Sequence, residues 1–248
     1  MKIKDQYIVL TGASSGIGFD LLKLLLQEGA YVLAISRTME SLEFDHERLT
    51  KLNADLTNKE AIDHVFDKAL SIFPSIDAFI ANAGFAYYER LLEASIDHIN
   101  QIFDINTLMP IYAAVKMKSL QKDKPFNYMA TLSAVSFVSL PGYALYSGTK
   151  SALRGFLEGY QLEMAKDQVI SLVYPVATKT NFFEVANQSH KPWPVQESMV
   201  VAKTMLKGLK KDKKAIYPSK LFKYSYKLIP WFYSFYKRRE LKKFNTLK

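Results

Sequence analysis

Short apolar runs alternate with helical stretches along most of this chain, and that alternation limits the fold more than any other feature. Continuous apolar runs are typical of strands buried on both faces, and intervening helices are typical of βαβ units. We predict strands at residues 7–10, 31–35, 52–56, 77–81, 127–132, 169–174 and 215–217, and helices at 16–28, 58–70, 96–120, 146–166 and 197–211. The predicted fold class is therefore α/β, a doubly wound parallel sheet in three layers with helices on both faces.

Size and composition fit one globular domain. The chain has 248 residues, of which 49% are hydrophobic and 23% charged, unlike a disordered chain. The lack of cysteine excludes disulfides, a thiolate nucleophile and cysteine-ligated metals. No apolar run reaches the ~20 residues of a transmembrane helix, and the N-terminus leads straight into a strand, so we expect a cytoplasmic protein, with or without membrane association. We divide the chain into a domain at 1–217 and a basic, aromatic C-terminal appendage at 218–248.

A glycine-rich turn joins the first predicted strand to the first predicted helix. Its sequence is Thr11-Gly12-Ala13-Ser14-Ser15-Gly16-Ile17-Gly18, with the spacing G-x-x-x-G-x-G rather than the standard G-x-G-x-x-G. Glycines permit a tight turn and let a pyrophosphate approach the backbone, and the helix N-terminus offers N–H groups and a positive dipole end. We predict a dinucleotide phosphate site formed by Gly12, Ser14, Ser15, Gly16, Ile17 and Gly18; a turn without a ligand is the alternative.

The end of the second predicted strand indicates which dinucleotide is bound. NAD enzymes place an acid there for the ribose 2′-hydroxyl, whereas NADP enzymes accommodate the 2′-phosphate with an arginine. This strand ends Ile35-Ser36-Arg37-Thr38, without an acid. The planar cation of Arg37 suits a phosphate, so we predict that NADP(H) is preferred over NAD(H). An arginine on a solvated loop is the alternative.

Four further side chains are candidates for catalysis. Tyr146 and Lys150 lie four residues apart at the start of a predicted helix, so they share one face. A phenol of pKa ~10 is a poor base, and a nearby ammonium lowers that pKa. Ser133 follows a predicted strand at the carboxyl edge of the sheet, where ligands bind in such folds. Asn106 is a mediocre helix former inside a long predicted helix, which indicates a local break or a held water.

Together these motifs resemble the short-chain dehydrogenase/reductase family. The resemblance covers most of residues 5–217. It rests on Thr11-Gly12-x-x-x-Gly16-x-Gly18, Asn82-Ala83-Gly84, Asn106, Ser133 and Tyr146-x-x-x-Lys150. It implies a Rossmann-like fold and an NAD(P)-dependent enzyme that acts on CH–OH or C=O groups.

The resemblance also implies a role for each motif residue. Tyr146 would be the general acid in ketone reduction, and Lys150 would bind the nicotinamide ribose and lower the pKa of Tyr146. Ser133 would orient the substrate, and Asn106 would hold a water in the proton relay. The cofactor would further contact Asp55, Leu56, Asn82, Ala83, Gly84, Pro175, Thr178 and Thr180. Where the family usually has Pro-Gly, this chain has Pro175-Val176, which adds bulk beside the nicotinamide.

Two loops are expected to face the substrate, at residues 134–143 and 182–193. Both are rich in apolar and aromatic side chains, which favours a lipophilic carbonyl compound or alcohol, although loop packing explains them nearly as well. We predict an NADP(H)-dependent oxidoreductase that transfers hydride reversibly. The alternative is a cofactor-binding regulator or scaffold without turnover. The resemblance implies a homodimer or homotetramer, through the helices at 96–120 and 146–166. The four histidines show no ligand spacing, so we predict no metal.

The net charge of +9 is concentrated at the C-terminus. Residues 1–202 hold 18 basic and 22 acidic residues, whereas residues 203–248 hold 15 and two. In the tail, Pro230 predicts two helices, with Lys220, Lys223, Lys227 and Lys237 on one side and Leu221, Leu228, Phe232 and Tyr236 opposite. An interfacial membrane helix and an interface or lid over the substrate are equally favoured interpretations. A nucleic-acid surface is less favoured, and we predict no nucleic-acid partner.

Overall fold

A parallel β-sheet forms the centre of the computed structural model, which describes residues 1–93, 95–180, 195–228 and 230–245. Within these residues the sheet has seven strands in the order β3-β2-β1-β4-β5-β6-β9. The strands are β1 (Tyr7–Thr11), β2 (Tyr31–Ser36), β3 (Leu49–Asn53), β4 (Ala78–Ala81), β5 (Phe126–Thr131), β6 (Gln168–Val173) and β9 (Ala215–Ile216). The strand order reverses between β1 and β4, and ligands of such sheets bind outside the carboxyl ends at that point.

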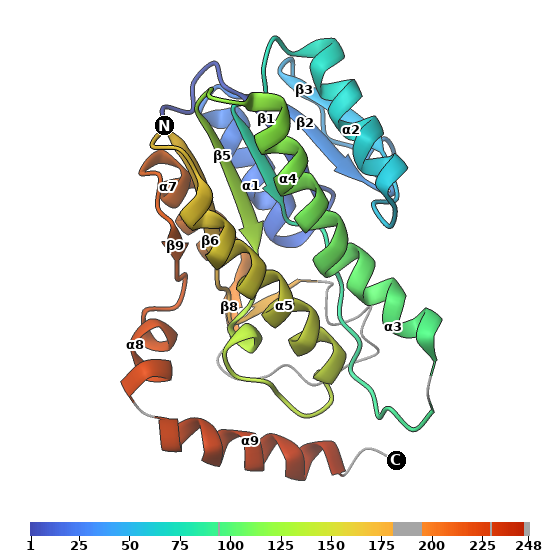
Figure 1. Cartoon of the computed structure of the whole chain (residues 1–248), viewed down its shortest axis with the longest axis vertical. Coiled ribbons are helices and arrows are strands. Elements are labelled where there is room, and N and C mark those ends of the chain that lie inside the picture. The colour runs from blue at the N-terminus through green and yellow to red at the C-terminus, as the bar shows by residue number, and fades with distance from the viewer. Residues whose placement is uncertain (94, 181–194, 229, 246–248) are drawn as a thin grey trace.

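Helices cover both faces of the sheet, which confirms the three-layer prediction (Figure 1). One face carries α2 (Lys59–Ile72), α4 (Met109–Gln121) and α5 (Ala144–Tyr160). The other carries α1 (Gly16–Gln27) and α7 (Ser198–Lys210). Because both faces are buried, apolar side chains point to both sides of β1: Val9 faces the first helix layer, and Ile8 and Leu10 face the second.

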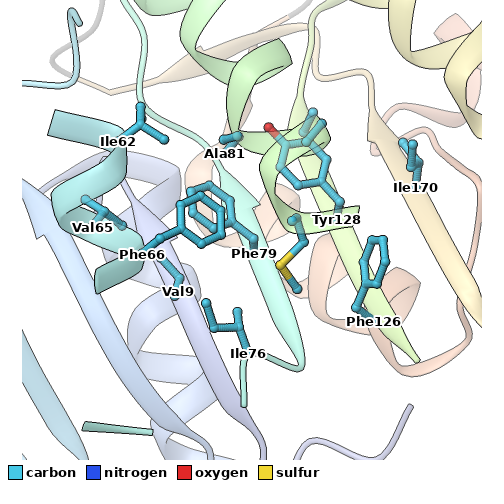
Figure 2. Packing of buried hydrophobic residues seen from close by; sticks show 14 of the residues in the cluster. Val9, Ile62, Val65, Phe66, Ile76, Phe79, Ala81, Phe126, Tyr128 and Ile170 are labelled. Carbon is cyan, nitrogen blue, oxygen red and sulfur yellow. The ribbon is translucent and has the colours of Figure 1, made fainter. Parts of the chain in front are cut away.

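Stacked aromatic rings form part of the core beneath α2 and α4. The Phe66 and Phe79 ring centroids lie 5.1 Å apart, and those of Phe79 and Tyr128 lie 5.7 Å apart (Figure 2). All three side chains are buried. Burial of an aromatic side chain of this size contributes about 2–3 kcal/mol, so this stack helps to fix α2 against β4 and β5.

Two helix-boundary signals in the sequence are confirmed. The Asn58 side chain caps α2 by accepting a hydrogen bond from the N–H of Ala61. Gly29 follows α1 with φ +83°, the left-handed conformation that favours glycine after a helix. These two helix boundaries could be predicted from the sequence because each depends on the type of one local residue.

Several boundaries differ from the prediction where the determinant is tertiary. The third strand is Leu49–Asn53 rather than 52–56, because it is a half-buried edge strand without a continuous apolar run. The predicted helix at 146–166 ends at Tyr160 and continues as a 3-10 turn, Gln161–Glu163. A second, two-stranded parallel sheet pairs β7 (Ala177–Lys179) with β8 (Val195–Glu197), which the sequence did not predict.

The long helix predicted at 96–120 is divided by a π-helix. It consists of α3 (Ile96–Phe103), a π-helical segment (Asp104–Leu108) and α4. Asn106 lies in the π-helical segment and is fully buried. The local break that this asparagine predicted is therefore present, and π-bulges of this kind are frequent at functional sites.

The tail forms two helices, α8 (Lys220–Leu228) and α9 (Pro230–Asn245), as Pro230 predicted. α9 lies across the end of the molecule opposite the N-terminus (Figure 1). The predicted apolar side is partly wrong, because Leu221 is 59% exposed while its neighbour Phe222 is buried; Tyr236 is buried as expected. Lys220, Lys223 and Lys237 are exposed. The side chains of Lys227, Leu228 and Phe232 lie outside the described residues.

Within the described residues, no helix has the length and apolar character needed to cross a membrane.

Candidate active site

The glycine turn between β1 and α1 has a shape that only glycine allows. Gly12 and Gly16 have φ of +66° and +53°. A Cβ at Gly18 would lie 1.9 Å from the carbonyl oxygen of Gly12, and one at Gly12 would lie 2.9 Å from Cα of Ala83. The Ser15 side chain makes no capping bond, so it leaves the first N–H groups of α1 without a side-chain acceptor. This turn is a cradle for an anion at a helix N-terminus.

A polar network fixes this turn to the neighbouring strands. The Thr11 hydroxyl accepts hydrogen bonds from the backbone N–H groups of Asn82 (3.0 Å) and Ala83 (3.1 Å). The Asn82 amide donates to the carbonyl of Gly12 (3.2 Å) and accepts from the Thr131 hydroxyl (3.0 Å). The carboxyl ends of β1, β4 and β5 are thereby held together at one edge of the sheet.

Tyr146, Lys150 and Ser133 meet at the same edge. The Lys150 Nζ donates to the carbonyl of Thr131 (2.9 Å) and lies 5.9 Å from the Tyr146 ring centroid. The Ser133 hydroxyl hydrogen-bonds the Tyr146 hydroxyl. Tyr146 and Lys150 are 9% and 5% exposed, so both polar groups are held in a largely water-excluded site.

Burial moves both pKa values away from their solution values. It raises the pKa of Tyr146 to about 12, and the hydrogen bond from Ser133 opposes that rise only partly. It lowers the pKa of Lys150 to about 8. Desolvation is thus the largest effect on the Tyr146 pKa, and the lowering of that pKa by Lys150 stays a prediction. At neutral pH the phenol is protonated and can serve as a proton donor.

Asn106 fixes the segment after β4 and does not line the cavity. Its Nδ2 donates to the carbonyl of Phe85 (2.7 Å) and to the Thr149 hydroxyl (3.3 Å), and its Oδ1 accepts from the N–H of Phe85 (3.1 Å). A Cβ at Gly84 would lie 2.5 Å from Oδ1. The asparagine therefore positions the backbone at Gly84 and Phe85. Its role in holding a water stays a prediction.

One large cavity connects these groups. Its volume is about 1200 Å³, larger than the ~300–1,000 Å³ of ordinary ligand pockets. It is lined by most of the residues assigned to the cofactor or to catalysis: Gly12, Ser14, Ser15, Gly16, Ile17, Arg37, Asp55, Leu56, Asn82, Ala83, Gly84, Ser133, Tyr146, Lys150, Pro175, Thr178 and Thr180. Gly18 and Asn106 do not line it. The cavity has room for more than one small ligand.

Arg37 lies at the end of β2 and is exposed where the cavity reaches the surface. Ser36 and Thr38 line the cavity beside it, and the Ser36 hydroxyl oxygen accepts from the N–H of Thr38 (3.2 Å). Among the described residues no carboxylate pairs with Arg37. This polar, cationic corner fits a phosphate better than a ribose hydroxyl that requires an acid.

The two predicted substrate loops have different outcomes. In the first, Val138, Leu140 and Tyr143 line the cavity, while the second, 182–193, lies outside the described residues. Val176 also lines the cavity, and its carbonyl accepts from the Thr178 hydroxyl (2.9 Å). The substituted Pro-Val turn is thus held by a local bond and projects a branched side chain beside Pro175.

Sequence reasoning missed several lining residues. Phe85 and Tyr87 follow β4 directly, and their position after a strand at the carboxyl edge was a usable signal. The tail contributes Leu221, Phe222, Ser225, Tyr233 and Tyr236. Of these, Leu221 and Tyr236 were on the apolar side predicted from the sequence, and Phe222, Ser225 and Tyr233 were missed. Spacing by three residues places Phe222 with Ser225, and Tyr233 with Tyr236, on one face of their helices, which was a usable signal.

A parallel sheet with an anion-binding glycine turn at its switch point defines a dinucleotide-binding protein of the Rossmann type. The chain belongs to the short-chain dehydrogenase family, whose model matches residues 6–191. It is 31% identical over 169 residues to an uncharacterised oxidoreductase of Staphylococcus saprophyticus, an alignment that covers 66% of this chain and 69% of the relative.

Solved structures share the fold. A short-chain dehydrogenase from Burkholderia cenocepacia, in complex with NADP, superposes with a TM-score of 0.81 and 24% identity over 97% of this chain and 99% of its own. A short-chain dehydrogenase/reductase from Burkholderia phymatum, in complex with NAD, gives a TM-score of 0.79 and 17% identity over 95% and 96%. This chain therefore has the same overall fold as these two proteins.

Proposed function

We propose that the chain is an NADP(H)-dependent oxidoreductase that moves a hydride reversibly between nicotinamide and the carbonyl or secondary alcohol of a lipophilic substrate. The observation that carries this proposal is one cavity that joins the glycine turn to the buried cluster of Tyr146, Ser133 and Lys150. The residues at the glycine end fit a dinucleotide, because their backbone leaves no room for a Cβ and offers free helix N–H groups. A bound nicotinamide supplies or accepts the hydride.

Each residue of the cluster has a proposed task. The Tyr146 hydroxyl, with a pKa of about 12, gives its proton to the substrate oxygen during reduction. Ser133, which already hydrogen-bonds that hydroxyl, orients the same oxygen. Lys150, anchored on the Thr131 carbonyl, binds the nicotinamide ribose and keeps positive charge beside the phenol when it ionises. We propose that Asn106 holds the water molecule of the proton relay.

The preference for NADP(H) rests on the corner formed by Ser36, Arg37 and Thr38. Its single cation and two hydroxyls match a 2′-phosphate, and no acid competes for the arginine among the described residues. The proposal of a lipophilic substrate is based on the side chains at the other end of the cavity. Val138, Leu140 and Tyr143 line that end together with tail residues such as Phe222.

We also propose a homodimer or homotetramer that uses α4 and α5. Val115 and Leu120 on α4 are each 43% exposed, which is apolar surface that a second subunit would cover. Size-exclusion chromatography with light scattering measures the molecular mass of the protein in solution. A mass equal to that of one chain would contradict this proposal.

Turnover by Tyr146→Phe tests the central assignment. A panel of hydrophobic ketones and alcohols, screened with both cofactors by nicotinamide absorbance, first supplies a substrate. Removal of the proton donor should lower kcat by at least about a hundredfold. NADPH affinity should change less than about twofold, because the ring that lines the cavity is retained.

The matched control is Tyr160→Phe, which removes a hydroxyl from the far end of the same helix. It should keep wild-type turnover. Wild-type kcat in Tyr146→Phe would overturn the assignment. NADPH binding without turnover of any panel compound by the wild type would favour the regulator or scaffold.

The cofactor assignment predicts a selective effect of Arg37→Ser. Loss of a charge-assisted contact to phosphate should weaken NADPH binding by about tenfold or more and leave NADH binding within about twofold. Fluorescence titration with both reduced cofactors measures this, with the exposed Arg239→Ser as control. Equal losses of affinity for NADPH and NADH would contradict a contact between Arg37 and the 2′-phosphate.

A further inference from the structure

The outer face of the two tail helices carries basic and aromatic side chains that no part of the described chain covers. The exposed basic residues are Lys220, Lys223, Lys237, Arg238, Arg239 and Lys242. Between them lie exposed apolar groups: Tyr224 is 58% exposed, Phe235 65% and Leu241 45%. We call this set of residues the outer tail face.

The charge of this face is not neutralised within the tail. Residues 218–248 hold nine basic residues and a single acid, Glu240. Glu240 is 4% exposed, points inward and pairs with Lys243 at 2.9 Å. Residues 1–202, in contrast, hold more acidic than basic residues. The tail therefore places a net positive charge at the end of the molecule spanned by α9 (Figure 1). A second basic segment, residues 203–217 with six basic residues and one acid, lies beside the N-terminus.

The inner face of the same helices is firmly seated on the domain. Phe222 and Tyr236 are buried, and the Tyr226 ring lies 4.5 Å from that of Phe137. The Arg90 side chain donates to the carbonyl of Phe244 (3.0 Å) and its guanidinium lies 4.9 Å from the Phe244 ring. Folding of the tail thus uses the inner residues, and the outer tail face is left for a partner.

We propose that the outer tail face docks on an anionic lipid bilayer. Clustered lysine and arginine attract anionic headgroups, and interleaved aromatic and leucine side chains enter the boundary between headgroups and acyl chains. Binding to a nucleic acid would explain the positive charge of the outer tail face but not its exposed Phe235 and Leu241 side chains. Because Phe222 and Tyr236 on the inner face line the cavity, docking also places the substrate end of the cavity beside the bilayer. This last consequence rests on the proposed function.

Vesicle co-sedimentation tests docking without substrate or cofactor. Vesicles of phosphatidylglycerol and phosphatidylcholine should pellet the full-length protein at low salt, vesicles of phosphatidylcholine alone should pellet little, and 0.5 M salt should release it. The double variant Arg238→Glu, Arg239→Glu should lower the partition coefficient at least about tenfold. Phe235→Ser should also weaken binding, and should do so at high salt as well.

Two matched controls separate docking from general charge and apolar effects. Lys211→Glu, Lys213→Glu reverses two exposed lysines beyond α7, near the N-terminus, and Leu162→Ser removes a leucine that is 85% exposed on another element. Both should bind vesicles as the wild type does. Circular dichroism spectra and thermal melting check that every variant remains folded.

Failure of the wild type to pellet with anionic vesicles would overturn the proposal. So would equal binding to uncharged vesicles, or equal loss in the tail and control variants. Tight binding of single- or double-stranded RNA in a mobility shift at the same salt, without vesicle binding, would assign the face to nucleic acid instead. None of these results bears on Tyr146→Phe turnover, so the two proposals fail separately.

Discussion

The ammonium group of Lys150 is buried, and its charged form is therefore penalised in the native state. Its pKa falls to about 8 from 10.5. Between these values the unfolded chain holds a proton that the native chain has released. Because the unfolded state then binds more protons, the free energy of unfolding rises with pH across this window. Lys150, which serves the proposed active site, therefore lowers the free energy of unfolding at neutral pH.

Lys150→Met removes that cost and should change how stability depends on pH. At pH 7 the variant should be the more stable protein, and the wild type should recover the difference between about pH 8 and 10.5. The recovered difference is at most about 3 kcal/mol. Urea denaturation at intervals from pH 7 to 10.5 measures it, with Lys124→Met as the exposed control. If the free energy of unfolding depended on pH in the same way for Lys150→Met and the wild type, burial would not be lowering the pKa of Lys150.

At this scale the sequence could identify residues but not their environment. Tyr146 and Lys150 were found because a spacing of four fixes a shared helix face. The net rise of the Tyr146 pKa could not be predicted, because it depends on desolvation, which is a property of the packed cavity. The bond from Lys150 to Thr131 joins residues 19 apart, and nothing in the local sequence indicates it.

Among the elements, α8 depends most visibly on aromatic packing. The Phe222 ring lies 5.1 Å from Tyr226, 6.1 Å from Phe137 and 6.3 Å from Tyr233. The Ser225 and Tyr233 hydroxyls also share a hydrogen bond between α8 and α9. Phe222 therefore joins the body of the protein to both tail helices.

Phe222→Ala should loosen both tail helices while the central sheet remains folded. A buried phenylalanine contributes ~3–5 kcal/mol in a core, and about 2 kcal/mol is a fair minimum at this more peripheral contact. Amide hydrogen exchange in α8 and α9 should accelerate about tenfold or more, with little change in β1 and β4. Tyr224→Ala, on the exposed side of the same helix, is the control. Unchanged protection in α8 would show that the ring is not what holds it.

Elements with a strong local signal were predictable, and elements made by pairing were not. The apolar runs of β1, β2 and β5 and the caps of α1 and α2 lie within single short segments. β7 and β8 are three residues each and pair only through the register of Ala177 with Val195, far apart in sequence. The apolar face of α8 was misassigned because both Leu221 and Phe222 are apolar and only the fold decides which is buried.

For the whole molecule, the boundary near residue 217 separates neither charge nor function cleanly. The excess of acids over bases predicted from the sequence holds for residues 1–202, whereas residues 203–217 already hold six basic residues and one acid, and the family model ends at residue 191. The cavity nevertheless takes Leu221, Phe222, Ser225, Tyr233 and Tyr236 from that tail. Charge is visible in the sequence, whereas a shared cavity wall appears only when the tail is folded onto the domain.

A chain ending at Tyr217 should keep cofactor binding and lose discrimination for large substrates. The glycine turn, the Thr11–Asn82 network and the Tyr146–Lys150 pair all precede the cut, so NADPH affinity should stay within about threefold. The substrate end of the cavity loses its aromatic wall, so KM for bulky lipophilic ketones should rise about tenfold or more, while KM for a three- or four-carbon ketone should change little.

Tyr236→Ala in the full-length chain gives the same comparison without exposing Phe137 and Tyr217 to solvent, and it should shift KM in the same direction but less. Steady-state kinetics over a series of ketones of increasing length measure both proteins. An unchanged length dependence would remove the tail from the substrate site, because a wall that contacts the substrate must contribute more as the substrate grows. Loss of NADPH binding in the shortened chain would instead make residues 218–248 part of the folding unit, and the division at 217 would be wrong.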